Sequence, residues 1–162
     1  MITLMSEKES IFLSSADMLV CPVNTRGVMG AGLAPIFERT YPDASASYKR
    51  ACADNHNSPL EPGGVHYARA RRGGRNIWIA FAATKDDWRE PSKLVWVRDI
   101  CNEIANDIEM KAMAYSRVDR VAVPALGAGL GGLSWDAVYN EMHEAFAHSN
   151  TIYEIYPPRS RR

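Results

Sequence analysis

The chain carries at residues 23–33 the stretch Val23-Asn-Thr-Arg-Gly-Val-Met-Gly-Ala-Gly-Leu33, directly after an apolar run over residues 18–23. Three glycines punctuate the stretch, and apolar residues at helical spacing begin at Leu33. Glycines let the backbone approach a ligand closely, and the unpaired N–H groups at a helix start attract anions. The order strand, glycine loop, helix therefore predicts an α/β fold with a cradle for a diphosphate and the Asn24 side chain at its edge.

A second stretch of the same kind lies late in the chain. Pro124-Ala-Leu-Gly-Ala-Gly-Leu-Gly-Gly-Leu133 again follows an apolar run, over residues 118–123, and precedes a predicted helix. Taken alone, the first loop is equally well an ordinary turn, because it matches neither the Walker pattern nor a complete G-x-G-x-x-G. Two strand–loop–helix units can grip one ligand from both sides at the C-terminal edge of a sheet. The pair therefore favours a binding site.

Length and composition narrow the class of protein. A chain of 162 residues is expected to form a single domain over residues 1–162. Its 19 basic and 19 acidic residues balance, so no global field marks a nucleic-acid-binding protein. The three cysteines have no C-x-x-C spacing and indicate a reducing compartment with buried thiols. No apolar run reaches the length of a membrane span, and no signal peptide is recognisable. We expect a soluble, cytoplasmic monomer with no membrane contact.

The pattern of apolar residues alternates between strand and helix periods along the chain. Strands are predicted at residues 2–5, 10–13, 18–23, 65–71, 76–82, 118–123 and 152–156. Helices are predicted at residues 32–41, 43–55, 91–108 and 134–146, with Ser134 as a cap, and a loop at residues 57–64. Residues 72–75 read as a hairpin turn. This order predicts a three-layer α/β/α domain around a central mixed, mostly parallel sheet.

Three segments together resemble one known family. They are residues 22–33, residues 124–135 and the stretch Ala82-Ala-Thr-Lys-Asp-Asp-Trp-Arg89. The chain is similar over nearly its whole length to macrodomains, the ADP-ribose-binding fold. Within that family it resembles the branch of the DarG antitoxins, which remove ADP-ribose from thymidine in DNA, and of the human terminal ADP-ribose glycohydrolase.

The resemblance implies a role for particular residues. Asn24 matches the asparagine that binds the distal ribose, and Lys85 matches the lysine on which catalysis depends in this branch. The implied partner is ADP-ribose, without any cofactor. The residues implied to contact ADP-ribose are Ser10, Ile11, Val23, Thr25, Gly27, Val28, Met29, Gly30, Ala31, Gly32, Leu126, Gly127, Ala128, Gly129 and Leu130.

The chemistry of lysine is consistent with this role for Lys85. The residue follows an apolar strand, so it is expected where that strand emerges at the sheet edge. An amine placed there can attack the anomeric carbon of a bound ribose, or the ring-opened aldehyde, and form a Schiff-base-like intermediate. Without the resemblance, a solvated lysine at the start of a loop is the commoner interpretation.

Two positions depart from the family pattern. The aspartate that binds the adenine amino group in most macrodomains aligns with Ser10, which has no carboxylate, after Glu9. The human relative has an aspartate in the second loop where this chain has Gly131, as DarG-like members also do. Asp86 and Asp87 could give acid–base help, although two carboxylates in a loop are more often simply solvated.

Some features of the sequence would also suit binding to nucleic acid. The hairpin over residues 69–75 contains four arginines, three more arginines fall within residues 159–162, and both groups could meet phosphates. Trp88 could stack on an unpaired base of single-stranded DNA. Solvated basic tips and tails are the alternative interpretation. The four histidines show no metal-ligand spacing, so no metal site is expected.

The expected function is removal of ADP-ribose from thymidine in ADP-ribosylated DNA, the reversal of a DarT-type modification, with Lys85 and Asn24 as the catalytic pair. Two alternatives stay open. The chain could bind ADP-ribose without hydrolysing anything, or it could release ADP-ribose from protein carboxylates or from ADP-ribose-1″-phosphate.

Overall fold

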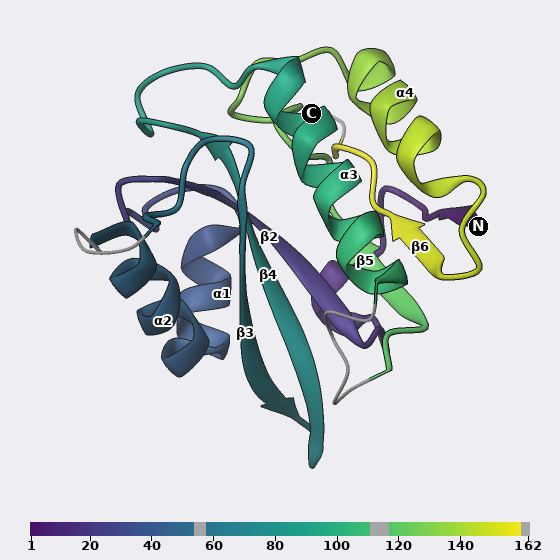
Figure 1. The fold of residues 1–162 in the computed structure, drawn as a ribbon, viewed down its shortest axis with the longest axis horizontal. Coiled ribbons are helices and arrows are strands. Elements are labelled where there is room, and N and C mark those ends of the chain that lie inside the picture. Colours follow the sequence, from purple (N-terminus) through teal and green to yellow (C-terminus); the bar gives the residue numbers. More distant parts are fainter. Residues whose placement is uncertain (54–57, 111–116, 160–162) are drawn as a thin grey trace.

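A computed structural model describes residues 1–53, 58–110 and 117–159. Within these ranges, six strands form one sheet in the order β1-β6-β5-β2-β4-β3 (Figure 1). Every neighbouring pair is parallel except β3 and β4, which form the predicted antiparallel hairpin. The strands are β1 (Ile2–Leu4), β2 (Met18–Asn24), β3 (Val65–Arg72), β4 (Arg75–Lys85), β5 (Arg120–Val123) and β6 (Ile152–Ile155). The predicted mixed, mostly parallel sheet is confirmed.

Helices cover both faces of this sheet. α1 (Ala34–Thr40) and α2 (Pro42–Ala53) lie on one face, and α3 (Leu94–Glu109) and α4 (Trp135–Phe146) lie on the other (Figure 1). Because parallel strands need a crossover connection, these helices pack back onto the sheet that they connect. The arrangement confirms the three-layer α/β/α prediction.

Alternate residues of the central strand serve the two layers. Met18 and Val20 of β2 pack toward α3 and α4, whereas Leu19 and Cys21 pack toward α1 and α2. All four side chains are fully buried. Each large apolar side chain removed from water contributes about 1.5–3 kcal/mol of transfer free energy. The continuous apolar run of β2 is therefore explained by burial on both faces.

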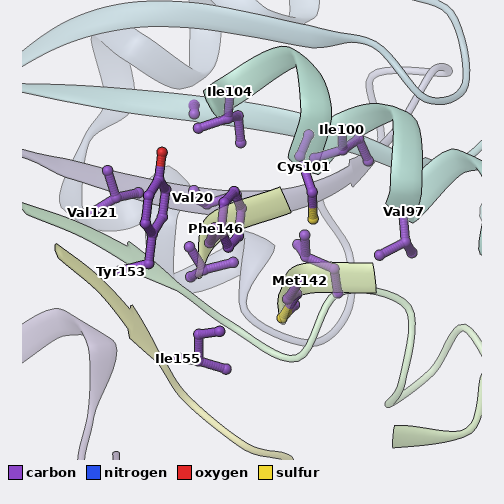
Figure 2. Packing of buried hydrophobic residues seen from close by; sticks show 14 of the residues in the cluster. Val20, Val97, Ile100, Cys101, Ile104, Val121, Met142, Phe146, Tyr153 and Ile155 are labelled. Atoms are coloured by element: carbon purple, nitrogen blue, oxygen red, sulfur yellow. The ribbon is translucent and has the colours of Figure 1, made fainter. Parts of the chain in front are cut away.

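The layer between the sheet and the α3–α4 pair is closely packed (Figure 2). Val97, Ile100 and Cys101 of α3 face Met142 and the other buried residues of α4. The rings of Phe146 and Tyr153 stack with their centroids 3.9 Å apart. This packing holds α4 against α3 and the sheet.

The strand predicted at residues 10–13 is wrong. These residues form a short 3₁₀ helix, η1 (Ile11–Leu13). The Ser10 hydroxyl accepts a hydrogen bond from the Phe12 N–H at 3.2 Å, and the Ser14 N–H bonds to the Ile11 carbonyl. A short apolar run cannot be assigned to strand or helix by periodicity alone. Here the hydrogen bond to the Ser10 side chain favours the helical turn over a strand.

Helix boundaries also differ from those expected. α1 begins at Ala34 rather than at Gly32, whose φ of +68° is outside the helical region. α2 begins at Pro42. Proline suits the first position of a helix, because the N–H groups of the first turn have no partner within the helix and proline has no N–H to leave unpaired. α3 begins at Leu94, since the N–H of Ser92 bonds instead to the Gly131 carbonyl. The predicted end of the second helix, at residues 54–55, and the start of the loop predicted at 57–64 lie outside the described residues.

Strand and cap predictions are largely confirmed. β5 starts at Arg120, two residues after the predicted start, and β6 ends one residue before Tyr156. Ser134 does precede α4 as its N-cap, but its side chain makes no capping hydrogen bond. Of the cysteines, Cys21 and Cys101 are buried as expected, whereas Cys52 is half-buried.

Candidate active site

A cavity of about 800 Å³ lies where the parallel strands end. The last residues of β2 and β4, and the loops that follow β2, β4, β5 and β6, contribute to its wall. Its size is within the range of pockets that enclose small organic ligands. The predicted site residues that line it are Ser10, Ile11, Val23, Asn24, Val28, Gly30, Ala31, Gly32, Lys85, Gly127, Gly129 and Leu130, and Trp88 lines it too. The two glycine loops are thus brought to one cavity.

Five predicted contact residues do not line this cavity. Met29 and Leu126 are buried in the apolar layers on the two faces of the sheet. Gly27 packs against α2, and Ala128 packs on the α3–α4 side. Thr25 makes contacts with the loop after β4. Proposed contacts of these residues with ADP-ribose stay predictions.

Other residues of the cavity wall were not among the expected contacts. Some of them lie within the three segments that carry the resemblance: Pro22, Leu33, Thr84, Pro124, Ala125 and Gly131. The rest come from the segment before β2, from α1 and from the segment after β6, where the sequence carries no such motif. They are Glu7, Glu9, Phe12, Ala34, Ile36, Tyr156, Pro157, Pro158 and Arg159.

The side chain of Asn24 organises the first glycine loop. Its Oδ1 accepts hydrogen bonds from the N–H groups of Arg26 (2.9 Å) and Val28 (3.3 Å), and its Nδ2 donates to the Val28 carbonyl (2.8 Å). The buried Tyr48 hydroxyl donates to the Asn24 carbonyl at 2.6 Å, and burial raises the pKa of Tyr48 well above its usual value. Asn24 is only 6% exposed. The loop is therefore held in shape by a carboxamide at its base, before any ligand is present.

Lys85 lies beside Asn24. In the parallel pairing of β2 with β4, Val23 pairs with Ala83 but Asn24 pairs with Lys85, so Thr84 is the extra residue of a bulge. A bulge redirects the side chains that follow it. The Lys85 Nζ donates a hydrogen bond to the Trp88 carbonyl at 3.2 Å. The lysine and the asparagine that the sequence singled out are therefore nearest neighbours on adjacent strand ends.

The second glycine loop is packed against the segment before α3. A Cβ on Gly131 would lie 2.4 Å from the Ser92 Oγ and 2.5 Å from the Gly127 carbonyl oxygen. Ser92 is 5% exposed, and its hydroxyl has no hydrogen-bond partner among the described residues. The aspartate of the human relative therefore has no room at this position. Glycine is what the backbone requires here.

The end of the cavity beside η1 contains a carboxylate after all. Glu9 lines the cavity, and its carboxylate accepts a hydrogen bond from the Ser6 N–H at 3.2 Å. The Ser10 hydroxyl, which the resemblance places at the adenine, is already an acceptor for the Phe12 N–H. The ring of Phe12 packs on Phe37 with centroids 4.7 Å apart. This end thus combines the aromatic ring of Phe12 with two acidic residues, Glu7 and Glu9.

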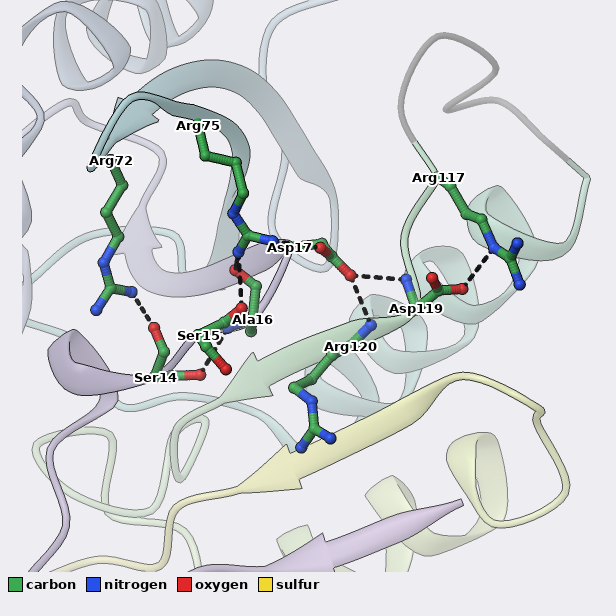
Figure 3. Close-up of polar contacts among 9 residues, drawn as sticks. All are labelled: Ser14, Ser15, Ala16, Asp17, Arg72, Arg75, Arg117, Asp119 and Arg120. Carbon is green, nitrogen blue, oxygen red and sulfur yellow. Dashed lines mark hydrogen bonds and ion pairs between the residues drawn. The ribbon is translucent and has the colours of Figure 1, made fainter.

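The arginines of the β3–β4 hairpin are not at this cavity. Arg75 begins β4 and Lys85 ends it, which separates them by about 33 Å at 3.3 Å per residue. Arg72 donates to the Ser14 carbonyl, and Arg75 donates to the carbonyls of Ser15 and Ala16 and to Asp17 (Figure 3). Arg72 also donates to the Phe12 carbonyl. These side chains hold the segment that enters β2.

The other hairpin and tail arginines divide between the surface and the cavity. The Arg69 guanidinium lies 4.7 Å from the ring centroid of Trp78, and Arg71 donates to the Gly74 carbonyl. Arg159 lines the cavity. The remaining arginines of the predicted basic tail, at positions 161 and 162, lie outside the described residues. Among the described arginines of the two predicted basic groups, Arg159 alone is therefore placed to meet a ligand in this cavity.

The two carboxylates after Lys85 have different partners. Asp86 accepts from the Thr25 hydroxyl at 2.5 Å, and Asp87 forms a two-point ion pair with Arg89. The hydrogen bonds from Arg89 hold the pKa of Asp87 well below its usual value. Neither aspartate lines the cavity. Both stabilise the loop rather than meeting the space where a ligand would lie.

Two classes of site are not seen in the described part of the chain. No group of three or more histidine, cysteine, aspartate or glutamate side chains lies close enough together there to hold a metal ion. Nor does any helix within those residues have the length and apolar character needed to cross a membrane.

Comparison with known proteins places this geometry in a family. The model of the macro domain family matches residues 20–142. The chain belongs to this family. It is 36% identical over 129 residues to a Thermus aquaticus protein named DNA ADP-ribosyl glycohydrolase. The aligned residues make up 80% of this chain but only 34% of that relative. This macro domain therefore spans about a third of the relative's length.

Solved structures of macro domains agree with the fold. The macrodomain of Mycobacterium tuberculosis DarG is 30% identical, has a TM-score of 0.85, and the match covers 99% of both chains. Thermosipho africanus DarTG in complex with ADP-ribose is 27% identical with a TM-score of 0.85, covering 99% of this chain and 42% of that one. The sheet order and the helix layers described above are thus those of DarG macrodomains.

Proposed function

We propose that this macro domain is an ADP-ribosyl glycohydrolase that releases ADP-ribose from thymidine in DNA, reversing a DarT-type modification. The observation that carries the proposal is the pairing of Lys85 with Asn24 at the wall of a cavity that also holds both glycine loops. The similarity to proteins named DNA ADP-ribosyl glycohydrolase supports this substrate.

ADP-ribose would lie across the strand ends. The backbone N–H groups of the two glycine loops are suited to the diphosphate. The adenine would lie toward η1, where Phe12 offers an aromatic face and Glu9 a hydrogen-bond acceptor. The distal ribose would then lie beside Asn24 and Lys85. This direction puts the bond to be broken next to the amine.

Lys85 acts as the nucleophile in this scheme. The lone pair of its amine forms a bond to the anomeric carbon of the ribose, and the bond from that carbon to the base nitrogen breaks. The base nitrogen keeps the electron pair and takes up the proton that the lysine nitrogen loses. Unmodified thymidine is thereby released in the DNA.

Water then frees the enzyme. The bond between the anomeric carbon and the ring oxygen breaks, the ring oxygen takes up a proton, and the lysine nitrogen forms a protonated Schiff base with that carbon. Water adds to the carbon and gives up a proton, the amine leaves, and the ribose ring closes. One water is consumed for each ADP-ribose released.

Trp88 is the proposed contact with the DNA. Its side chain is 50% exposed and lines the cavity, three residues after Lys85. The Arg89 guanidinium, which is paired with Asp87, lies 5.2 Å from its ring centroid. An exposed indole of this kind can stack on an unpaired base. Single-stranded DNA is therefore the proposed form of the substrate.

The substrate class is tested by offering three substrates to the wild-type chain: an ADP-ribosylated thymidine oligonucleotide, a glutamate-linked ADP-ribosyl peptide and ADP-ribose-1″-phosphate. We expect the oligonucleotide to be turned over fastest. The variant Trp88→Ala should raise KM for the oligonucleotide about tenfold, in line with the loss of one stacking contact, and Trp88→Phe should retain most of the affinity. Binding of ADP-ribose without turnover of any substrate would favour the reader function instead.

A further inference from the structure

Thr25 and Asp86 join the two loops that leave the ends of β2 and β4. The Thr25 N–H donates to the Asp86 carbonyl at 3.0 Å. The Thr25 hydroxyl lies 2.9 Å from the same carbonyl oxygen and 2.5 Å from the Asp86 Oδ1. A hydroxyl has a single proton, and the short distance to the carboxylate is typical of a charge-assisted hydrogen bond. The hydroxyl therefore serves mainly the carboxylate, and the amide serves the carbonyl.

These contacts stand next to the residue pair that the proposed reaction uses. Asn24 and Lys85 form the last register pair of β2 with β4, immediately after the bulge at Thr84. Beyond that pair the strand ladder provides no further restraint. Thr25 and Asp86 are the next residue on each side, so their contacts close the end of the ladder.

The pair does not touch the space where the ligand would lie. Neither Thr25 nor Asp86 lines the large cavity; both line a separate, smaller one of about 390 Å³. The Arg26 guanidinium lies 3.8 Å from the Asp86 Oδ2, which restrains the carboxylate from its other side. We therefore expect Thr25 to act on the reaction through Lys85 and Asn24, which are the neighbouring residues of Asp86 and Thr25 in the chain, rather than through a direct contact with the ligand.

We propose that Thr25 is a positioning residue, whose hydroxyl holds the segment of Lys85 against the base of the first glycine loop through Asp86. The inference rests on the proposed function of Lys85. A bulge leaves the direction of the following side chain dependent on its neighbours, and misplacement of a reacting group by 1 Å can cost about 100-fold in rate. The Thr25 hydroxyl thus sets the angle at which the amine meets the ribose, without contributing to ligand affinity.

Three variants test the role of this hydroxyl. Thr25→Val removes the hydroxyl and keeps the branched shape, Thr25→Ser keeps the hydroxyl, and Thr40→Val is the matched control. Thr40 is an exposed residue of α1 whose hydroxyl donates to the Ile36 carbonyl at 2.7 Å. With the ADP-ribosylated oligonucleotide, we expect Thr25→Val to lower kcat about tenfold. The ADP-ribose Kd should stay within about twofold of the wild-type value, and Thr25→Ser and Thr40→Val should keep their kcat.

Two kinetic outcomes would overturn the proposal: a Thr25→Val variant with wild-type kcat, or a Thr25→Ser variant as slow as Thr25→Val. A drop in kcat matched by an equal loss of ADP-ribose affinity would likewise overturn it, since this would show a structural defect of the cradle.

A measurement without substrate separates this inference from the proposed function. Acetylation of Lys85 by acetic anhydride is followed by mass spectrometry, with the exposed Lys93 of the same chain as the internal reference. If the hydroxyl holds Lys85, the ratio of Lys85 to Lys93 labelling should change at least about threefold in Thr25→Val and stay unchanged in Thr25→Ser. An unchanged ratio in Thr25→Val would overturn the positioning role, even if the wild-type chain hydrolyses every substrate offered.

Discussion

Some single residues of the cavity wall have surroundings that leave them little freedom. Gly131 is one of them, because the atoms around it leave no space for a side chain. Ser92 and Gly127 fill that space from two sides. The second glycine loop is therefore a rigid part of the cavity wall.

The variant Gly131→Ala should weaken ADP-ribose binding at least about tenfold, because relieving the overlap with Ser92 and Gly127 must displace the loop. Isothermal titration measures the effect. The control Gly73→Ala lies in the hairpin turn, where φ is +56° and a Cβ meets nothing within 4 Å. This control should lose about 1 kcal/mol of stability and bind ADP-ribose normally. Wild-type affinity in Gly131→Ala would contradict the rigid-loop description.

At the scale of elements, the β3–β4 hairpin supports the site from a distance. Arg72 reaches from the end of β3 to the carbonyls of Ser14 and Phe12, on either side of the end of η1. Phe12 lines the cavity. The hairpin therefore stabilises the segment where we place the adenine, rather than binding DNA at the cavity.

The variant Arg72→Ala should lower the unfolding free energy by about 1–2 kcal/mol, since two carbonyl groups lose a charged donor. It should also weaken ADP-ribose binding. Arg71→Ala is the matched control. Arg71 is exposed, and among the described residues its side chain donates to Gly74 and Asn76 of the same hairpin, so we expect a change below about 0.5 kcal/mol. Urea unfolding measures the change in unfolding free energy, and titration with ADP-ribose measures the change in affinity. Equal effects of the two variants would refute the assigned role of Arg72.

At the scale of the whole molecule, one buried carboxylate ties the N-terminal segment to β5 and β6. Glu154 accepts hydrogen bonds from Ser14 (2.6 Å), Arg120 (2.8 Å) and Tyr156 (3.1 Å). Burial alone would raise the pKa of Glu154, but these donors outweigh it and the pKa is lowered. Burial also raises the pKa of Tyr156 to about 12, so its hydroxyl stays a donor at neutral pH.

A carboxylate with a lowered pKa stabilises the fold above its ordinary pKa and loses that contribution as the pH falls. The unfolding free energy should therefore drop as the pH decreases below about 4.5. Glu154→Gln should lower the unfolding free energy by about 2–3 kcal/mol at pH 7 and make its decrease at acid pH less steep. Asp119→Asn, which breaks the exposed pair with Arg117, should cost less than about 0.5 kcal/mol. Urea unfolding from pH 3 to 7 measures this pH dependence. An equally steep decrease of the unfolding free energy in Glu154→Gln would contradict the prediction.

The sequence allowed the layers to be predicted because alternating strand and helix periods reflect burial on both faces of β2. It did not allow η1 to be predicted, since the Ser10 cap competes with a strand over the same few apolar residues. Both glycine loops could be found locally, whereas the role proposed for Lys85 was suggested only by the resemblance. The parts of the cavity wall formed by Glu7, Phe12 and Tyr156 have no local signal, because these residues meet the glycine loops only when the sheet is assembled.

The proposed reaction depends on attack by Lys85 on the ribose held in this cavity. This step is tested by the single-turnover rate of ADP-ribose release from an ADP-ribosylated thymidine oligonucleotide, with wild-type and Lys85→Ala chains side by side. We predict a loss of at least about 100-fold in Lys85→Ala, with the Kd for free ADP-ribose within about twofold of wild type. Release at the same rate by both chains would rule out Lys85 as the nucleophile.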